Sequence, residues 1–560
     1  GGGPPPGASV VRRAADAITN LAHENVVIKS RVRADGGVPP LVALLESCDA
    51  KVQRAAAGAL RTLAFKNEDN KNQIVECGAL PTLIQMLRAD DAGVHYEAVG
   101  VVGNLVHSSQ HIKRRVLDEG ALQPVIGLLS SACAESQREA ALLLGQFATT
   151  DTDTKARIVQ RGAVPPLVDM LASSDVQLQE MAAFALGRLA QNGDNQAGVA
   201  QAGGLPPLLR LLASRNGNLQ HNAAFALYGL ADCDDNVAPL VREGGVRALL
   251  ECELLVQPSK DCVQKTLKRL EDKMTGPVLA QVLYAMRGPD RGVRERTACA
   301  LARLARDADL RTVFVDRKGL DVLLGLLTDP ARDPAAQREA AGALFELATK
   351  ASATAPVDCA PAPPTPQVYL GEQYVNNPTL SDVTFVVEGH TFHAHRIALL
   401  ASSDTFRAMF AGHYRERDAP RIPIPNIRLP VFEAMMRCVY TGSVDVEPAL
   451  AEDLLRAADQ YMLEPLKRLC EASLASTLTV ATLQATHDLA EAFAAPSLAR
   501  RCVLHALERY DDVAAALEPA GFCALMRRMV PKLREGLTEQ LVRKGGEATG
   551  AETPAAAAQG

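Results

Sequence analysis

One phrase recurs along this 560-residue chain at an almost constant interval. Each copy is a glycine, a small residue, an aliphatic residue, often a proline, and then an apolar run that ends in Leu-Leu or Met-Leu. The copies begin at Gly36, Gly78, Gly120, Gly162, Gly203 and Gly244. Successive copies are therefore 42, 42, 42, 41 and 41 residues apart. A fixed period of this size is typical of a solenoid, in which each unit packs only against its neighbours.

Each unit also carries a phrase of small and apolar residues at helical spacing, as in 54–64 and 180–190. This spacing predicts a buried helix that packs closely on the neighbouring units. A corner rich in Asn and Asp follows, and a short helix then leads to the next glycine. Glycine suits a helix end that needs positive φ, and proline suits the first turn of the helix that follows. We therefore predict three helices in each unit.

A unit of three helices and about 42 residues resembles the armadillo repeat, whose stacked units form a right-handed solenoid. The array is predicted over residues 8–350. It is not uniform, because the next phrase after Gly244 begins at Gly276, only 32 residues later, and Gly319 follows after 43. We expect the unit at 244–275 to be shortened and the curvature to change there.

The armadillo resemblance implies that the third helices line a concave groove. Importin-type members bind an extended peptide there through Asn and Trp residues. Only two Asn remain in the corresponding column, and the chain has no Trp, which disfavours nuclear-import cargo. Arginines in this region favour an acidic or phosphorylated partner, since guanidinium pairs well with carboxylate and phosphate. The alternative is a solvated polar helix surface. The predicted client-groove residues are Asn20, Arg61, Asn104, Gln146, Arg188 and Arg303.

The composition changes after the array. Residues 351–367 are rich in proline and predict an extended spacer between domains. Beyond them, alternating apolar residues predict strands at 383–387 and 391–395. A third strand is predicted at 421–425, where the prolines indicate an edge position. Apolar residues at helical spacing then predict a helical extension over 476–543. The final segment, 544–560, is rich in Gly, Ala and Glu and is predicted to be disordered.

Three motifs in the strand region resemble the BTB (POZ) family. They are the segments 381–385 (Ser-Asp-Val-Thr-Phe), 392–403 and 440–442 (Tyr-Thr-Gly). We place the BTB/POZ domain at 368–475. The predicted fold is thus mainly α, with an armadillo-repeat α-solenoid followed by an α+β BTB/POZ domain and a helical extension similar to the BACK type.

The BTB resemblance implies a homodimer or heterodimer through this domain. Residues 368–377 are similar to the swapped N-terminal helix of the family. The dimer-interface residues implied by the resemblance are Asp382, Tyr369, Leu370 and Tyr374.

BTB proteins that recruit a cullin scaffold carry a hydrophobic residue, any residue and a glutamate shortly after the Met-Phe end of a helix. In this chain Tyr414-Arg-Glu416 stands at that offset. The cullin-binding residues implied by the resemblance are Tyr414, Glu416, Phe410 and Met409.

Composition and missing motifs exclude several classes of function. The chain has 59 Lys and Arg against 65 Asp and Glu, which gives a net charge of −6. This charge disfavours binding to the phosphate backbone of nucleic acid. Twelve scattered cysteines without a C-x-x-C indicate reduced thiols rather than disulfides or zinc. We expect no membrane span, since no apolar run reaches ~18 residues. Without nucleotide, metalloprotease or esterase motifs, we predict no enzyme, no metal and no cofactor. The chain lacks an initial Met, so we expect residues before Gly1.

The combination of both domains resembles a plant-type armadillo-repeat/BTB family that binds transcription factors of abscisic acid signalling or of the cell cycle. The resemblance implies an adaptor in the nucleus and cytoplasm. Its array would hold a client such as a transcription factor, and its BTB dimer would recruit a cullin-RING ubiquitin ligase. The alternative is a non-degradative scaffold or transcriptional co-regulator that pairs with other BTB proteins. An importin-like receptor is disfavoured.

Overall fold

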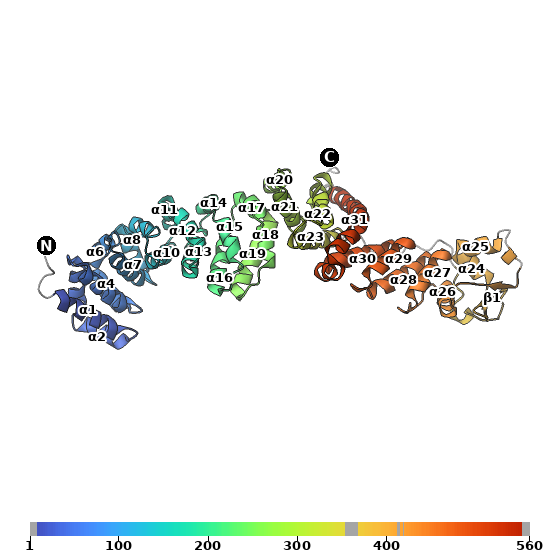
Figure 1. The fold of residues 1–560 in the computed structure, drawn as a ribbon, viewed down its shortest axis with the longest axis horizontal. Helices are drawn as coiled ribbons and strands as arrows, with labels where there is room; N and C mark the ends of the chain where they lie inside the picture. Colours follow the sequence, from blue (N-terminus) through green and yellow to red (C-terminus); the bar gives the residue numbers. More distant parts are fainter. Residues whose placement is uncertain (1–7, 353–367, 412–414, 418, 551–560) are drawn as a thin grey trace, which may run out of the picture. The chain divides into compact units, whose positions relative to one another are not determined.

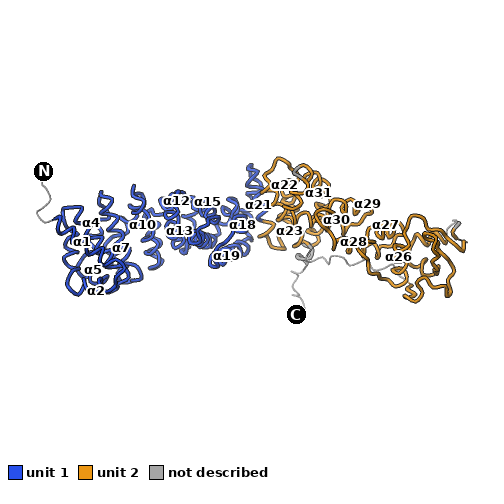
Figure 2. Tube along the Cα trace, turned by 60° about the horizontal axis from the view of Figure 1, so that its bottom comes forward, with its two compact units in different colours: residues 1–300 blue, residues 301–560 orange. Residues whose placement is uncertain are grey.

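The computed structural model describes residues 8–352, 368–411, 415–417 and 419–550 (Figure 1). The chain forms two compact units, residues 1–300 and 301–560 (Figure 2). Both units are mainly helical, and a three-stranded sheet occurs in the second. Every helix in the described ranges is too short or too polar to span a bilayer.

Unit 1 consists of repeats of three helices, as predicted. The first helices of the repeats are α2 (Val26–Ala34), α5 (Glu68–Glu76), α8 (Gln110–Asp118), α11 (Thr152–Gln160), α14 (Gly193–Gln201) and α17 (Asp234–Arg242). The second helices are α3 (Val38–Ala43, continued by the 3-10 helix η1, Leu44–Glu46), α6 (Ala79–Met86), α9 (Leu122–Leu128), α12 (Val164–Leu171), α15 (Leu205–Leu211) and α18 (Gly245–Glu251). The third helices are α1 (Ala8–Ala22), α4 (Ala50–Ala64), α7 (Ala92–Val106), α10 (Ala134–Phe147), α13 (Val176–Leu189), α16 (Gly217–Leu230) and α19 (Gln257–Lys273).

The recurring glycines have the conformation that the sequence predicts. All six adopt left-handed φ values, between +77° for Gly36 and +87° for Gly162. Each stands between the first and second helix of a repeat, where a residue with a Cβ atom would be strained. The period of the sequence is therefore the period of this turn.

The third helices pack side by side in chain order from α1 to α19. Small residues make this close approach possible. In α4, for example, Ala55, Ala56, Ala57 and Ala59 are all buried. The leucines beside them, such as Leu60 and Leu63, are fully buried and add apolar contact within the array.

Buried asparagines connect the repeats through main-chain hydrogen bonds. The Asn70 Nδ2 donates to the main-chain oxygens of Lys29 (3.2 Å) and Leu63 (3.1 Å). Asn195 and Asn236 form the same pair of bonds in later repeats. Each asparagine lies in the first helix of a repeat and donates to two carbonyls of the preceding repeat, one in its first helix and one near the end of its third helix.

Buried lysines form a second set of connections. The Lys29 Nζ donates to the Phe65 carbonyl at 2.7 Å, and the Lys71 Nζ donates to the His107 carbonyl at 2.8 Å. These carbonyls belong to the residues that end α4 and α7, where a cation opposes the helix dipole. Burial lowers the pKa of Lys29.

The irregular part of the array follows α19. Helix α20 (Gly276–Ala285) was expected to begin a second helix at the Gly276 phrase, but it packs on α17, a first helix. Only Met274 and Thr275 separate α19 from α20, so no residues are left for a separate first helix. Helix α20 therefore takes that place in the packing. The change of curvature at 244–275 stays a prediction.

Unit 2 begins within α21 (Arg291–Leu304). The end of the predicted array continues with η2 (Asp307–Asp309), the π-helix η3 (Thr312–Asp316), α22 (Gly319–Thr328) and α23 (Pro334–Ser352). The next part contains η4 (Glu372–Tyr374), β1 (Val383–Val387), β2 (His390–Ala394), α24 (Arg396–Ser402), α25 (Asp404–Ala411), η5 (Arg415–Arg417), β3 (Arg421–Pro423), α26 (Leu429–Thr441), α27 (Ala451–Gln460) and α28 (Glu464–Ser476). Helices α29 (Leu483–Ala492), α30 (Pro496–Glu508) and α31 (Tyr510–Gly550) follow.

The sheet has the strand order β2-β1-β3. Strands β1 and β2 are antiparallel, with Val383 opposite Ala394, and β3 pairs with β1 in parallel. The predicted edge position of β3 is therefore confirmed, and its prolines do not interrupt a central ladder. Behind the sheet, the rings of Phe385 and Phe392 meet Phe432 of α26 at centroid distances of 5.4 and 5.3 Å.

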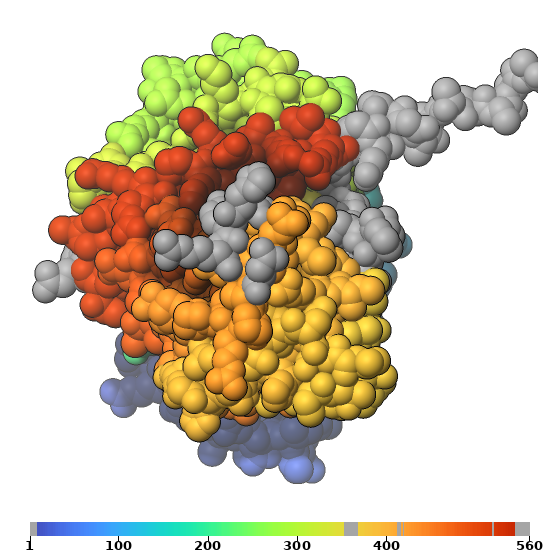
Figure 3. All heavy atoms as spheres, turned by 90° about the vertical axis from the view of Figure 1, so that its right-hand side faces the viewer, coloured from blue at the N-terminus to red at the C-terminus, as the bar shows by residue number. Residues whose placement is uncertain are grey.

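The C-terminal helices pack back onto the end of the array. Helices α30 and α31 contact α23, and α31 also contacts α22. The buried Tyr510 hydroxyl donates to the Gln337 Oε1 at 3.1 Å, and Arg338 pairs with Asp511 at 2.7 Å. In Figure 3 the atoms of α30 and α31 (orange-red) lie next to those of the strand-containing part (yellow to orange). The last array helices and the C-terminal helices thus share one core.

Two predicted segments fall partly or wholly outside the described residues. Of the Pro-rich spacer 351–367, only 351 and 352 are described, and they end α23. Of the tail predicted to be disordered, 544–550 belong to α31, so the prediction begins too early. Residues 551–560 lie outside the described part.

Candidate interaction sites

The groove arginine Arg61 is neutralised within the array. Its guanidinium pairs with Glu139 at 2.8 Å and with Glu97 at 3.6 Å, and it lies 4.8 Å from the centre of the Tyr96 ring. Burial raises the pKa of the Glu97 carboxyl, and the nearby Arg61 opposes that rise. In unit 2, Arg303 is likewise paired, with Glu346 at 2.5 Å. Neither arginine presents a free charge to a partner.

The three predicted groove residues with amide side chains differ in how far the fold already uses their hydrogen-bonding groups. The Asn104 Nδ2 donates to the Arg61 carbonyl at 2.9 Å and so connects α7 to α4. Asn20 is exposed on α1. Gln146 lines a hollow, and its buried Oε1 has no hydrogen-bond partner among the described residues. Gln146 is thus less committed to the fold than Asn104.

Arg188 stands apart from the other groove arginines. It is exposed, and within the described ranges it forms no ion pair. Its guanidinium carbon lies 5.4 Å from the ring centres of both Phe184 and Phe225. The three arginines predicted for the groove therefore differ in whether an acidic side chain neutralises them. Among these groove residues, Arg188 alone is held between aromatic rings and keeps an unneutralised charge within the described ranges.

The predicted dimer-interface residues gather at one end of the sheet. The Asp382 carboxylate accepts a hydrogen bond from the main-chain N–H of Arg396 at 2.8 Å, at the start of α24. The Tyr374 ring meets His395 edge-on at 5.7 Å. His395 also bonds the Tyr440 hydroxyl at 2.8 Å, and burial raises the pKa of Tyr440 to about 12. These groups stabilise the fold, and a role in dimer contact stays a prediction.

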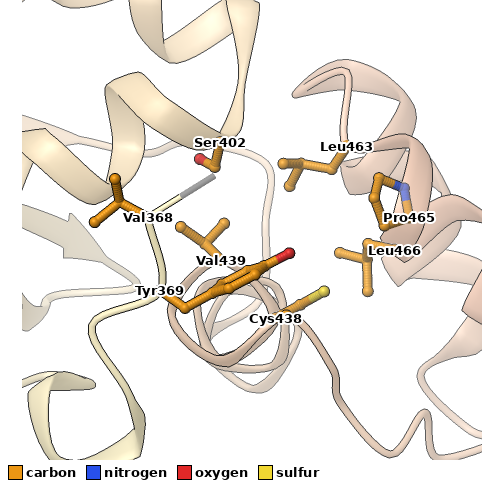
Figure 4. Close-up of a pocket in the computed structure, with 9 residues that line it drawn as sticks. Val368, Tyr369, Ser402, Cys438, Val439, Leu463, Pro465 and Leu466 are labelled. Atoms are coloured by element: carbon orange, nitrogen blue, oxygen red, sulfur yellow. The ribbon is translucent and has the colours of Figure 1, made fainter. Parts of the chain in front are cut away.

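The segment around Tyr369 packs on its own domain (Figure 4). The Tyr369 ring lies against Gly442, where a Cβ atom would be only 2.8 Å from the ring. The main chain after Leu370 is tied down as well, since the Gly371 N–H donates to the Tyr440 carbonyl at 2.9 Å. A small hollow beside Tyr369 is lined by Val368, Ser402, Cys438, Val439, Leu463, Pro465 and Leu466.

The long N-terminal helix implied at 368–377 is not present there. This segment contains only the 3-10 turn η4, Glu372–Tyr374. Gly371 has a φ of +90°, and Pro378 disfavours helical backbone in the residue before it. Both ends of the segment thus stop a helix, and the implied helix is wrong for this chain.

The predicted cullin-binding residues surround the end of α25. Tyr414 lies outside the described residues. Met409 is half-buried, while Phe410 is only 6% exposed and stacks on Phe406. Phe410 therefore supports the surface from below and cannot itself be a broad contact. Glu416 lies in η5, is partly exposed and forms no ion pair within the described ranges.

Arg396 holds the chain on which Glu416 stands. Its guanidinium donates to the carbonyls of Arg417 (2.5 Å) and Ala419 (3.4 Å). The same group lies 4.9 Å from the centre of the Phe410 ring. A single side chain thus connects the end of α25 to the segment after it, which fixes the position of η5.

One cluster in the C-terminal helices has the composition of a metal site. Ligand atoms of His487, Asp488 and Glu491 lie within 4.8 Å of one another. However, Arg528 pairs with both carboxylates, and Lys532 pairs with Glu491 at 2.9 Å. Because two cationic side chains already occupy the carboxylates, the cluster does not fit a metal ion. It is better described as an ion-pair network that joins α29 to α31.

Within this network, the buried His487 side chain lowers the free energy of unfolding. It is fully buried, and both ring nitrogens have no hydrogen-bond partner among the described residues. Burial lowers the pKa of His487 below its ordinary value of 6.5, as do Arg528 and Lys532, while Glu491 and Asp488 oppose this effect. The folded protein therefore holds a neutral imidazole.

We expect His487→Leu to stabilise the C-terminal helices by about 1 kcal/mol at neutral pH, because it removes two unsatisfied buried groups. The unfolded state takes up a proton near pH 6.5 while the folded state resists it, so the wild type loses stability as the pH falls below about 6.5. The variant should lose less. Thermal unfolding at several pH values checks this, and parallel pH profiles would contradict it.

Sequence reasoning missed several of these residues. Phe184 and Phe225 are 41 residues apart, at matching positions of the recurring helix phrase, so the period alone could have placed them on neighbouring third helices. Arg396 lies inside the 392–403 motif. Its contact with residues 417 and 419 has no signal in the sequence.

Comparison with known proteins confirms both predicted domain types, the armadillo repeats and the BTB/POZ domain. The family model of the BTB/POZ domain matches residues 371–478, and that of the armadillo/beta-catenin-like repeat matches residues 27–65, 67–107 and 151–191. The chain is 68% identical over 535 residues to "ARM repeat protein interacting with ABF2" of Arabidopsis thaliana. That alignment covers 96% of this chain and 75% of the relative.

Two further comparisons are more limited. "Armadillo BTB Arabidopsis protein 1", from the same plant, is 53% identical over 288 residues, which are 51% of this chain and 38% of that protein. The crystal structure of an engineered protein aligns with a TM-score of 0.46 at 28% identity, covering 62% of this chain and 86% of that one.

Proposed function

Since this chain belongs to the family of armadillo-repeat/BTB proteins, we propose that it is an adaptor that brings a client protein to a cullin-RING ubiquitin ligase. Armadillo repeats and BTB domains are interaction domains without enzymatic activity. The adaptor itself would transfer no ubiquitin. It would hold the client in the array and the cullin scaffold on the BTB domain, in the nucleus and the cytoplasm.

The observation that carries the cullin half is the fixed position of Glu416. Arg396 holds the segment after η5 through two carbonyls, and Phe410 lies beneath its guanidinium. The Glu416 carboxylate has no internal cation within the described ranges, so its charge is available to a partner. A carboxylate on a rigid edge beside half-buried Met409 is the kind of contact that a basic, partly apolar helical surface would bind.

The client half is supported by the name of the first relative, which records an interaction with ABF2. We propose a transcription factor of that kind, active in abscisic acid signalling, as the client of this chain. A BTB dimer would present two arrays, so a client with two binding segments would be held with higher avidity than a single array provides.

We expect Glu416→Lys to weaken binding of the full-length protein to a cullin N-terminal domain at least about tenfold. Reversing an unpaired interface charge leaves two like charges facing each other, and this costs at least about tenfold in Kd. The Kd is measured by titrating the full-length protein over an immobilised cullin N-terminal domain. Charge reversal at Glu119, an exposed residue at the end of α8 in the array, is the matched control and should bind like the wild type.

A wild type that does not bind any cullin would overturn the ligase half of the proposal. The non-degradative scaffold would then be the working function, and its partners would be sought among other BTB proteins. Equal loss in both variants would point to a general effect of charge, and this too would contradict the specific role of Glu416.

A further inference from the structure

The proposed function does not specify which chemistry the array recognises. We propose that the surface of α10, α13 and α16 binds an extended protein segment that carries a phosphate or a carboxylate, and that Arg188 holds this anion. These three third helices are consecutive neighbours in the array (Figure 1). The inference rests on the proposed function only in that the array has a protein client.

Two aromatic rings fix the position of the Arg188 guanidinium. Its carbon lies 5.4 Å from the ring centres of Phe184 and Phe225. The guanidinium is held beside both rings, and its N–H groups can form paired hydrogen bonds to two oxygens of a phosphate or carboxylate. Because the side chain is already ordered, little rotamer freedom is lost on binding.

The two rings are themselves held by glycines of the preceding helix. A Cβ atom at Gly145 would lie 2.4 Å from the Phe184 ring, and one at Gly187 would lie 3.1 Å from the Phe225 ring. Each phenylalanine thus lies against bare backbone of the neighbouring third helix. The sequence keeps this room at matching positions, 42 residues apart. Arg188 is therefore positioned by the fold of three repeats.

The charge of Arg188 is not used inside the array. Arg61 is paired with Glu97 and Glu139, and Arg269 lies 3.7 Å from Asp232. Arg188 has no such partner within the described ranges, although it lies on the same row of helices. An exposed, pre-ordered cation without a counter-charge favours an anionic group from outside.

The hollow beside Phe184 supplies groups for the main chain of the same segment. It has a volume of about 510 Å³ and is lined by Phe184, Gln146, Lys113, Thr149, His107, Ser108, Gln110, Val106 and Leu142. Lys113 is only 5% exposed, and its Nζ donates to the Thr149 hydroxyl at 2.8 Å. An ammonium has three donors, so Lys113 can also donate to a carbonyl of a bound segment.

Lys113 differs here from its equivalents in the earlier repeats. Lys29 and Lys71 donate to the carbonyls that end α4 and α7, whereas the acceptor of Lys113 within the described ranges is a side-chain hydroxyl. The Gln146 amide beside it has a buried oxygen without a partner. The hollow thus contains a donor and an amide that the fold does not fully use, as recognition of an extended main chain requires.

The spacing suits one extended segment. Neighbouring helices lie roughly 8–10 Å apart, and an extended chain advances about 3.3 Å per residue. A segment whose main chain meets Gln146 on α10 would therefore place a side chain at Arg188 on α13 two or three residues further along. A single anionic side chain in the segment would be enough to be selected.

Short peptides of random sequence with a fixed central residue test this proposal. Four pools carry serine, phosphoserine, glutamate or lysine at the centre, and the full-length protein selects from each. We expect the phosphoserine or glutamate pool to bind about tenfold more tightly than the serine pool. Selection of phosphoserine alone would identify phosphate as the anion, and selection of both would admit carboxylate.

Variants then assign the effect to residues. Arg188→Ala should remove the preference for an anion, and Arg188→Lys should keep only part of it, because lysine cannot form the paired contact. Gln146→Ala should weaken all four pools alike. Arg161→Ala removes an exposed arginine at the end of α11 and should behave like the wild type. Unchanged thermal unfolding of each variant excludes misfolding.

The outcomes separate this inference from the proposed function. Peptide binding without an anion preference, or a preference that survives Arg188→Ala, would overturn the inference and leave the array as a client site. No peptide binding at all by the wild type, with cullin binding intact, would contradict the client half of the proposed function as well.

Discussion

Replacing Phe432 by alanine is expected to destabilise the BTB domain by about 3–5 kcal/mol, since it removes a fully buried ring from the centre of a cluster. Phe432 meets Phe385 of β1 and Phe392 of β2 edge-on, so its loss leaves a cavity between α26 and the sheet. Neither strand ring can fill the space without leaving the other side of the core. We expect β1, β2 and α26 to open together.

Hydrogen exchange measured by mass spectrometry locates this effect. Amides of β1, β2 and α26 should exchange at least about a hundredfold faster in the variant, while those of α4 to α16 keep the rates of the wild type. Phe65→Ala is the matched control, because Phe65 is 46% exposed and should cost little. Faster exchange spread evenly over the array would contradict a local core.

The second large effect concerns the buried asparagines of the array. We expect Asn236→Ala to cost about 1–3 kcal/mol, because two buried carbonyls each lose the hydrogen bond that the amide donates. The Asn236 Nδ2 donates to Leu230 at 2.9 Å and to Gln196 at 3.1 Å. These bonds connect α17 to α14 and to the end of α16 in the preceding repeat, so the loss should weaken the stacking of these two repeats.

Denaturant unfolding of the full-length protein, followed by circular dichroism, checks the size of the change. Asn218→Ala in α16 is the control, since Asn218 is exposed and its side chain should contribute less than about 0.5 kcal/mol. If Asn236→Ala unfolded like the control, the asparagine connection would not carry stability.

The parts of the fold that follow local backbone rules were predictable from the sequence. The left-handed glycines between first and second helices and the edge position of β3 depend only on what Gly and Pro allow at single positions. The buried lysines were visible as a period of 42 residues at Lys29, Lys71 and Lys113, but an isolated lysine ordinarily lies on the surface. Their burial depends on an acceptor after the third helix of the same repeat, a carbonyl for Lys29 and Lys71 and the Thr149 hydroxyl for Lys113.

The sequence predicted that a row of third helices forms the candidate site. It did not predict which polar residues on these helices are already paired within the array. Arg61 and Arg188 lie one position apart in the recurring phrase, since Arg188 corresponds to Thr62 and Arg61 to Gly187, but this offset alone does not tell which arginine is paired. Their difference arises because Glu97 and Glu139, on the next two third helices, both reach Arg61. The return of α31 onto α22 and α23 is a contact between distant segments, which no local pattern encodes.

That return has a consequence for how the chain can be divided. The chain leaves α23 at Ser352 and enters the strand-containing part after residue 367, yet both belong to one compact unit. A protease that cut between them would yield a nicked protein whose two fragments stay joined through Gln337, Tyr510 and the helices around them. The boundary between the two compact units lies instead at residues 300 and 301 inside α21, so a cut between these units would have to break a helix.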